Sequence, residues 1–424
     1  MIWNKFPIFR ATLLAAGLKA YASILSVIFT FVVARLLGAS EAGLVFLAMT
    51  VLTLGGAIFR LGFEAIVLRE FGRQVDGLSA FNITNVALAW ISIISVPICI
   101  GLYIFRNDIS ADIFHKVGFS DVLGLIVIAI PLMATFQLLS FAYQGQKKIF
   151  NAIFLQNMAY LSFATVGLLV VNKLYPQSLN SRTTACVVLA SISLTWLYAF
   201  ISWCRRNFLS ISISDLIDKE LFSSGGQLWL ANLSTLGIAW SGVIACGVFL
   251  EAEQIAFLST AQRLALVICF SLLVCDVVMA PRYASLYAKQ DLTTMRLFAQ
   301  RATIAMLVIV SPLMLLILMF SEEIMGLFGA GFERGALYLI VLSFAQLVNV
   351  ATGSVGQLLT MSGFEKDYRN ITMGIALAFV PLIVIATKVI GGNGTVIMTA
   401  CAIVSQNVFG AFMVKKRLGF WPGL

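Results

Sequence analysis

Apolar stretches long enough to cross a lipid bilayer recur along the whole chain, and this feature constrains the fold more than any other. The hydrocarbon core of a bilayer is about 30 Å thick, so a helix needs about 20 apolar residues to span it. Within that core the chain must satisfy its own backbone hydrogen bonds, which an α-helix does locally. With 60% hydrophobic and 11% charged residues, the chain carries more apolar surface than a soluble domain buries. The sequence therefore predicts an all-α integral membrane protein.

The hydropathy pattern predicts about twelve transmembrane helices in two six-helix lobes. The longest internal polar connection, RRNFLSISISDLIDKELFSSGG, starts at Arg205, after the sixth span. We therefore expect an N-terminal lobe at 1–204, a cytoplasmic linker at 205–224 and a C-terminal lobe at 225–424. A weak match between ASEAGLVFLA and EAEQIAFLS favours repeats related by a pseudo-two-fold axis along the membrane normal. The spans are expected near 12–34, 42–63, 81–105, 122–143, 150–172, 183–203, 226–249, 255–280, 301–320, 336–361, 371–390 and 394–414.

Basic loop residues predict the orientation of the chain. With the N-terminus inside, about 18 Lys and Arg lie on the cytoplasmic side and about 7 on the other. This asymmetry places both termini in the cytoplasm. The first apolar run is longer than the core of a cleavable signal peptide, so we expect a retained first helix. Proline inside four spans (Pro97, Pro131, Pro312 and Pro381) is either a kink or an ordinary membrane-helix proline.

Charge and composition argue against several classes of function. The net charge of +9 is scattered over short loops, which does not favour nucleic-acid binding. The seven Cys lie in or beside apolar spans without a CxxC pair, and the one His, His115, lies in a loop. We therefore expect no metal, no cofactor and no disulfide framework. The chain lacks a GxxxxGK[ST] loop, so we expect it not to hydrolyse ATP.

Three cations lie inside apolar spans: Lys19, Arg60 and Arg263. A charge in the bilayer core costs several kcal/mol (about 2.5–3.5 by insertion scales) unless it faces water or a partner. Each side chain alone could instead snorkel to the interface. Together the three favour a central cationic cavity, and the planar guanidinium fork suits a phosphate. The sequence thus indicates an anionic, phosphate-bearing cargo.

Other polar residues in the spans have two interpretations each. Glu64 and Asp276 either carry a coupling ion or pair with nearby cations. Amides and an indole on spans 7 and 10 either contact sugars or support helix packing. The span 10 residues have a spacing that keeps one helix face. These candidate sugar contacts are Gln227, Trp229, Asn232, Gln346, Asn349 and Gln357.

Residues 10–75 resemble a known family. A lysine-bearing first helix is followed by VVARLLGASEAGLVFLAMTV and then by LGFEAIVLREFGR. This pattern resembles the polysaccharide transporter (Wzx-type O-antigen flippase) family of the MATE-like flippase superfamily. The resemblance extends over the whole chain as an architecture of twelve helices in two lobes around a V-shaped central cavity.

The resemblance implies a flippase and not an enzyme. Such proteins move an undecaprenyl-pyrophosphate-linked oligosaccharide from the inner to the outer leaflet of the bacterial cytoplasmic membrane. In related lipid II flippases, cavity arginines on helices 1, 2 and 8 are held to bind the pyrophosphate, and Lys19, Arg60 and Arg263 occupy similar places. We expect a monomer in the lipid bilayer, with a polysaccharide polymerase and a chain-length regulator as further partners.

Two alternatives remain open from the residues. A cation-coupled multidrug exporter of similar fold would carry more acids than bases in its cavity, whereas bases predominate here. A membrane polymerase or glycosyltransferase would need a large outer loop with catalytic acids. The longest outer loop, RNDISADIFHKVGFS, is short, and its acids Asp108 and Asp112 are better explained as solvated loop charges.

Overall fold

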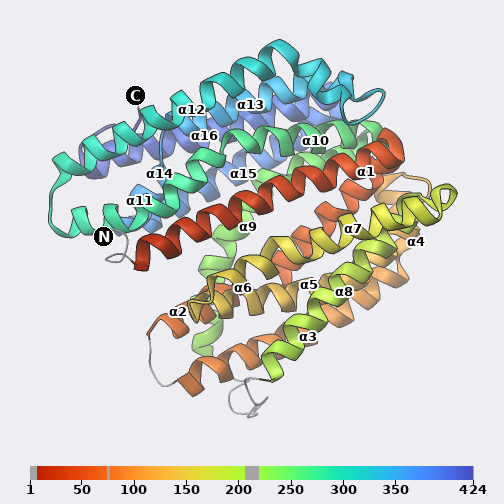
Figure 1. Ribbon diagram of the computed structural model, residues 1–424, viewed down its shortest axis with the longest axis horizontal. Coiled ribbons are helices and arrows are strands. Elements are labelled where there is room, and N and C mark those ends of the chain that lie inside the picture. The colour runs from red at the N-terminus through yellow and green to blue at the C-terminus, as the bar shows by residue number, and fades with distance from the viewer. Residues whose placement is uncertain (1–6, 74–76, 206–218, 424) are drawn as a thin grey trace. The chain divides into compact units, whose positions relative to one another are not determined.

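The computed structural model describes residues 7–73, 77–205 and 219–423. This part of the chain is helical and contains no β-strand (Figure 1). Short π-helical or 3₁₀ segments lie at Ile109–Phe114, Phe154–Met158, Pro176–Ser178 and Phe332–Gly335. The α-helices are α1 (Pro7–Phe59), α2 (Phe63–Arg73), α3 (Gly77–Ile104), α4 (Arg106–Asp108), α5 (Phe119–Gly145), α6 (Ile149–Ile153), α7 (Ala159–Leu174), α8 (Ser181–Cys204), α9 (Lys219–Phe249), α10 (Ala252–Ile268), α11 (Phe270–Ala288), α12 (Leu292–Gly326), α13 (Ala336–Ala351), α14 (Val355–Met361), α15 (Glu365–Ile390) and α16 (Gly392–Leu418).

The helices confirm a multi-pass membrane protein. Within the described ranges, nine helices are long and apolar enough to cross a membrane, or eleven if each strongly bent pair is one span. Helix α1 is itself two helices that meet at Gly38, whose φ of 77° and ψ of 173° are not helical. Glycine adopts such a positive φ without a Cβ clash. The count is therefore consistent with the twelve predicted spans.

Several spans are interrupted, but the interruptions are not at the prolines. Helices α10 and α11 bend by 48° where they meet. Helices α13 and α14 are separated by a turn containing Gly353, which has a φ of +75°. By contrast, α3, α5 and α15 each continue through an internal proline. Broken helices in transporters often lie near bound substrates or ions, so these breaks are candidate functional positions.

The described helices form two compact units, which we treat separately. Unit 1 comprises Met1–Val27, Gly237–Leu250 and Ala256–Leu424, and unit 2 comprises Ile28–Leu236 and Glu251–Ile255. Helices α1, α9 and α10 contribute to both. The lobes expected at 1–204 and 225–424 stay a prediction, and most of the predicted linker at 205–224 lies outside the described residues.

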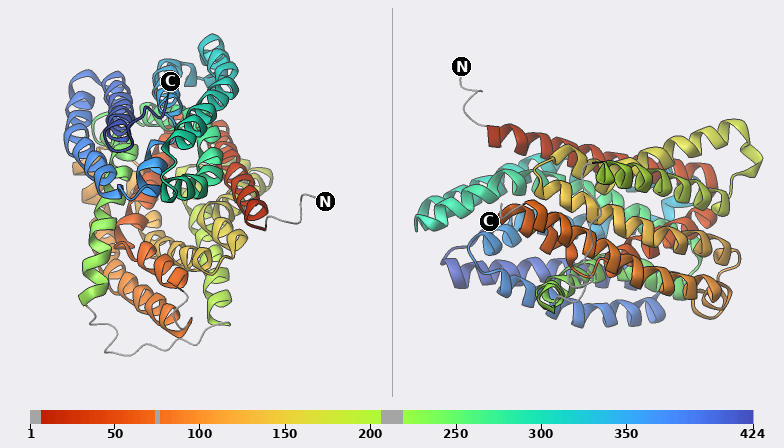
Figure 2. Two further views of the ribbon diagram at one scale, coloured as in Figure 1. Left: turned by 90° about the vertical axis from the view of Figure 1, so that its left-hand side faces the viewer. Right: turned by 90° about the horizontal axis from the view of Figure 1, so that it is seen from below.

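Unit 2 is organised around α5, which packs against both α3 and α8; Figure 2 gives two further views of the helices. The indole of Trp203 on α8 is fully buried and donates to Oδ1 of Asn85 on α3 over 3.0 Å. The hydroxyl of Tyr143 on α5 donates to Oγ of Ser202 over 3.0 Å. These bonds satisfy the polar ends of two large aromatic residues inside an apolar core.

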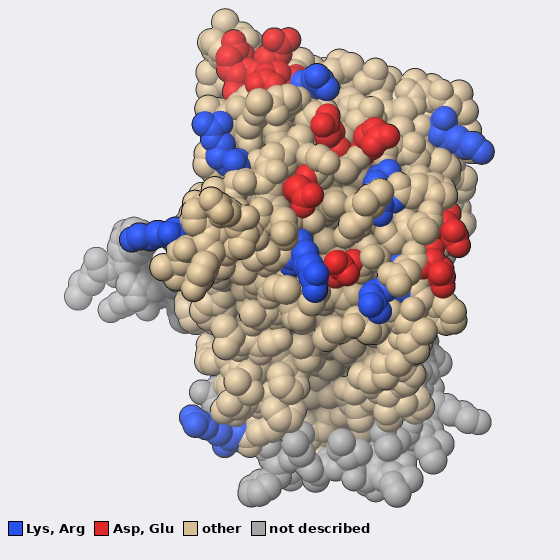
Figure 3. Space-filling model, turned by 90° about the vertical axis from the view of Figure 1, so that its right-hand side faces the viewer, with Lys and Arg blue, Asp and Glu red and all other residues tan. Residues whose placement is uncertain are grey.

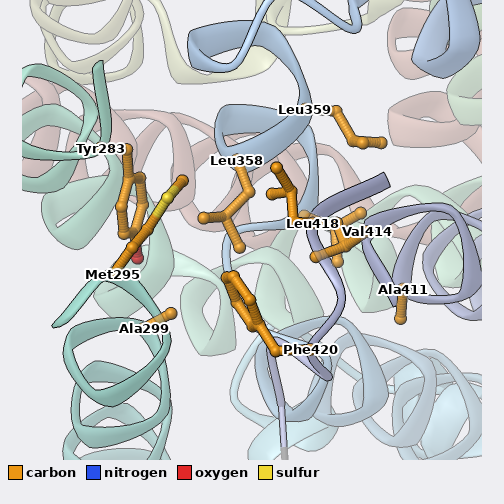
Figure 4. Packing of buried hydrophobic residues seen from close by; sticks show 10 residues of the cluster. Tyr283, Met295, Ala299, Leu358, Leu359, Ala411, Val414, Leu418 and Phe420 are labelled. Atoms are coloured by element: carbon orange, nitrogen blue, oxygen red, sulfur yellow. The ribbon is translucent and has the colours of Figure 1, made fainter. Parts of the chain in front are cut away.

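Unit 1 has a core in which α11, α12, α14 and α16 meet (Figure 4). Tyr283 and Met295 face Leu358, and Phe420 packs below them after α16 has ended at Leu418. Gly419 ends α16 with a φ of +80°, the left-handed conformation common at helix C-termini. The chain beyond α16 is thereby folded back onto the core.

Charged side chains on the face shown in Figure 3 are mixed in sign. Lysine and arginine are interspersed with aspartate and glutamate and do not form a basic stripe on this face. Charge on this face is therefore not of one sign, and the orientation of the chain in the membrane stays a prediction.

Candidate functional site

Arg60 lies in a break between two helices of unit 2. Helix α1 ends at Phe59 and α2 begins at Phe63, and the turn places Leu61 at φ 54° and Gly62 at φ 79°. Glycine suits this conformation, whereas a leucine with a positive φ is uncommon. Arg60 is only 8% exposed. The break therefore fixes a buried guanidinium at the join of the two helices.

Polar partners surround the Arg60 guanidinium. Its Nε lies 3.7 Å from Oε2 of Glu64, which is also 8% exposed. Its Nη1 donates to Oε1 of Gln137 on α5. Because an isolated buried charge is costly, these partners stabilise the charged side chain. Of the two interpretations given for Glu64, the structure contains the ion pair.

Helix α9 contacts both sides of this break within unit 2. Nε1 of Trp229 donates to the carbonyl oxygen of Ile58 over 3.0 Å. Nδ2 of Asn232 donates to Oε1 of Glu64, also over 3.0 Å. Residues three apart lie on one helix face, so a single face of α9 contacts the last turn of α1 and the first turn of α2.

Unit 1 brings Arg263 against the first part of α1. Nη1 of Arg263 on α10 donates to Oγ of Ser26 over 3.0 Å. Lys19 is exposed and lies seven residues before Ser26. Seven residues make two helical turns, so Lys19 and Ser26 share a face of α1 about 10 Å apart. The Arg263 side chain of α10 therefore contacts the side of α1 on which Lys19 lies.

Asp276 on α11 lies within electrostatic range of Lys19 and close to Ser354, at the start of α14. Its Oδ1 atom is buried without a hydrogen-bond partner among the described residues. The carboxylate thus combines a nearby cation, a hydroxyl and an unsatisfied oxygen. Asp276 is therefore a candidate for the coupling role predicted from the sequence.

The amides of span 10 hold the bend between α10 and α11. Cys269, at this bend, donates from Sγ to Oε1 of Gln346 over 2.8 Å. Nδ2 of Asn349 lies 3.2 Å from both Sγ of Cys269 and Oε1 of Gln346. Gln357 lies on α14, beyond the turn at Gly353. The single polar helix face expected along span 10 is therefore wrong, because the positive φ at Gly353 divides the helix.

Some site residues were not predicted from the sequence. Gln137 and Ser26 carry neutral side chains. Each belongs to the site because it bonds to an arginine there, and that contact is known only from the structure. A lone amide in the apolar span around Gln137 was the available signal. The side chain predicted at Gln227 lies outside the described residues. In the described part of the chain, no group of three His, Cys, Asp or Glu side chains could hold a metal ion.

The helical fold with interrupted membrane-spanning helices is similar to solved membrane transporter structures. The chain superimposes on an inward-facing multidrug resistance MATE family transporter of the MOP superfamily with a TM-score of 0.76 and 14% identity, covering 94% of each chain. It superimposes on the lipid II flippase MurJ in an inward closed conformation with a TM-score of 0.74 and 15% identity, covering 95% of this chain and 87% of the other. At these identities the likeness establishes the fold.

The chain belongs to the polysaccharide biosynthesis protein family, whose family model matches residues 8–287. It is also 22% identical over 400 residues to the "Probable low-salt glycan biosynthesis flippase Agl15" of Haloferax volcanii, covering 92% of this chain and 78% of the relative. The predicted polysaccharide family is therefore confirmed. These similar proteins are described as flippases or transporters.

Proposed function

We propose that this protein is a flippase that moves an undecaprenyl-pyrophosphate-linked oligosaccharide repeat unit, of O-antigen or a related surface polysaccharide. It would move this lipid from the inner to the outer leaflet of the bacterial cytoplasmic membrane by alternating access. One combination of observations carries the proposal. A member of the polysaccharide biosynthesis protein family places cations within its apolar spans, and one of them, Arg60, is buried. Cations inside a membrane are rare and mark substrate or ion pathways, and a diphosphate is an anionic cargo that suits them.

Lys19, Arg60 and Arg263 are the proposed diphosphate ligands. Lys19 and Arg263 belong to unit 1 and share one side of α1, whereas Arg60 belongs to unit 2. Arginine donates two parallel hydrogen bonds to a phosphate, and lysine adds a compact charge. Each cation would contact the diphosphate during the transport cycle, while the lipid chain stays in the bilayer.

The proposed sugar contacts are the amide and indole side chains predicted on spans 7 and 10. Asn232 would accept from sugar hydroxyls with its amide oxygen and Trp229 would contact the sugar with its ring, while their bonds to Glu64 and the Ile58 carbonyl persist. Gln346 and Asn349 would exchange their bonds with Cys269 for bonds with sugar hydroxyls. Gln227 and Gln357 complete the proposed set.

Transport requires an energy source, and Glu64 and Asp276 are the proposed coupling residues. Asp276 supports this role best because a buried oxygen lacks a hydrogen bond within the described residues, and Lys19 is nearby. A proton or cation bound at Asp276 would change the electrostatic potential at Lys19. Ion binding at Asp276 would thereby be coupled to diphosphate binding at Lys19. The proposed orientation keeps both termini in the cytoplasm.

Deleting the gene in its host and extracting the lipid-linked intermediates tests the function. The proposal predicts accumulation of the diphosphate-linked oligosaccharide on the cytoplasmic side, with loss of surface polysaccharide. The wild-type gene should restore export. Single repeat units accumulating on the outer side would instead indicate a polymerase. Unchanged glycan lipids with greater sensitivity to toxic cations would indicate a multidrug exporter.

A further inference from the structure

The break between α1 and α2 is enclosed by hydrogen bonds from its own backbone and from α9. The Leu61 amide donates to the Ile58 carbonyl over 3.3 Å, and the Phe63 amide donates to the Arg60 carbonyl over 2.9 Å. Trp229 donates to the same Ile58 oxygen. Carbonyls in the last turn of a helix lack intrahelical partners, so these bonds satisfy groups that the break exposes.

The conformation of this turn depends on its surroundings. A non-glycine residue in the left-handed region costs about 1–3 kcal/mol and persists where neighbouring structure enforces it. Leu61 is such a residue, with φ 54°. The contact from α9 is therefore a means of holding the turn, and with it the positions of Arg60 and Glu64.

Glu64 occupies the position that a phosphate would need at Arg60. Its carboxylate lies 3.7 Å from the Nε atom, and Gln137 accepts from Nη1. Both charged side chains are 8% exposed, so little of the guanidinium is open to an incoming anion. An anion that binds Arg60 as a bidentate ligand must therefore displace the carboxylate.

We propose that Glu64 is an internal counter-anion that exchanges with a phosphate group of the substrate at Arg60, and that Asn232 and Trp229 are positioning residues for this exchange. The inference rests on the proposed function, because it requires an anionic cargo. It assigns Asn232 and Trp229 to the control of the diphosphate site.

The exchange has a physical advantage for transport. Without substrate, Glu64 neutralises Arg60, so neither buried charge is left unpaired. When a phosphate displaces it, the carboxylate keeps the hydrogen bond from Asn232 and is not left unsatisfied. When the substrate departs, the carboxylate returns to Arg60 and opposes rebinding. Glu64 thereby limits the affinity of Arg60 for the phosphate, so that the substrate can be released.

Pyrophosphate binding to the full-length protein in lipid nanodiscs tests this exchange. Glu64→Gln keeps the side-chain size but removes the competing charge, so it should bind inorganic pyrophosphate about tenfold more tightly, within the range of typical coupling energies. An Arg60→Ala, Glu64→Gln variant should bind no more tightly than Arg60→Ala alone. Asn407→Leu, in which the lost amide bonds to the Ile403 carbonyl of its own helix, is the matched control, with affinity expected within about threefold of wild type.

Asn232→Leu provides the second variant. Without its amide, Glu64 loses its alternative hydrogen bond and should compete more strongly, weakening pyrophosphate binding by about threefold to tenfold. This effect should disappear when Glu64→Gln is also present, and Asn232→Gln should restore part of the affinity. A merely structural role would not produce that dependence on Glu64.

The outcomes separate the two proposals. If pyrophosphate binding depends on Arg60 but Glu64→Gln does not strengthen it, the exchange is overturned and the proposed diphosphate site stands. If the wild-type protein does not bind pyrophosphate, or binds it equally well without Arg60, the assignment of Arg60 to the diphosphate fails and the exchange fails with it.

Discussion

Asn232 and Glu64 are 168 positions apart in the sequence, yet the Asn232 amide donates to the Glu64 carboxylate over 3.0 Å. The bond joins α9 to the first turn of α2 within one compact unit. It connects a residue predicted to contact sugars with one predicted to carry a coupling ion. The contribution of this hydrogen bond to stability can therefore be measured separately from its contribution to transport.

Replacing Asn232 with leucine should reduce the free energy of unfolding by about 1–2 kcal/mol. Interhelical hydrogen bonds in membranes contribute about 0.6 kcal/mol on average, and loss of a partner for a buried carboxylate adds to the cost. Thermal unfolding of the purified protein measures the change. Asn407→Leu is a suitable control because, among the described residues, its amide bonds within its own helix, to the Ile403 carbonyl. An equal effect from both variants would contradict this account.

Lys19 should be needed for export but not for insertion into the membrane. Lys19→Ala should reduce surface polysaccharide by about tenfold or more, since it removes a proposed phosphate ligand, while Lys19→Arg should keep more activity because it preserves the charge. Complementation of the deletion strain, with protein levels measured in the membrane fraction, gives the comparison. Normal surface glycan in a stably expressed Lys19→Ala, Arg263→Ala variant would refute the proposed role of these cations.

Gly43 should not tolerate a side chain. A Cβ at this position would collide with the backbone carbonyl of Ala252, which begins α10. Gly43→Ala should therefore destabilise unit 2 by about 1–3 kcal/mol, the usual cost of overpacking. Gly101→Ala is the matched helical control, because a Cβ there meets nothing within 4 Å. Gly101→Ala should be neutral or slightly stabilising. The melting temperatures of the two variants, each compared with that of the wild type, test this prediction.

Asp291 should make the first turn of α12 sensitive to acid. The Thr294 amide donates to the Asp291 carboxylate over 3.0 Å and lowers the pKa of that group below its usual range. A carboxyl whose pKa is lowered by folding stabilises the fold above its ordinary pKa, and the contribution is lost as pH falls through the lowered value. Protection of this turn from hydrogen exchange should therefore decrease in acid. Asp291→Asn retains an acceptor without a charge and should remove the pH dependence that this group contributes; unchanged dependence would contradict the cap.

The sequence predicted the features that depend on neighbouring residues. Apolar runs predicted the helices, and the interval between the spans expected near 12–34 and 42–63 contains Gly38, where the two parts of α1 meet. The spacing of Arg60 and Glu64 allowed an ion pair. The family resemblance in residues 10–75 was confirmed by the match over residues 8–287.

The sequence did not predict contacts that depend on packing. Prolines were the available signal for interrupted helices, whereas the turns lie at Gly38, Gly62 and Gly353, where the backbone has a positive φ. Nothing near Trp229 in the sequence indicates that its indole bonds to the Ile58 carbonyl. Such partners are set by which helices become neighbours, and this is not encoded in local spacing.

Reconstitution in proteoliposomes tests the central claim most directly. Purified protein would be combined with an undecaprenyl-pyrophosphate-linked oligosaccharide confined to one leaflet, and its appearance in the other leaflet measured with a membrane-impermeant sugar-modifying enzyme. The account predicts protein-dependent translocation by the wild type and a rate close to that of empty liposomes for Lys19→Ala, Arg263→Ala. Translocation by the wild type no faster than in empty liposomes, under an imposed ion gradient or without one, would contradict it.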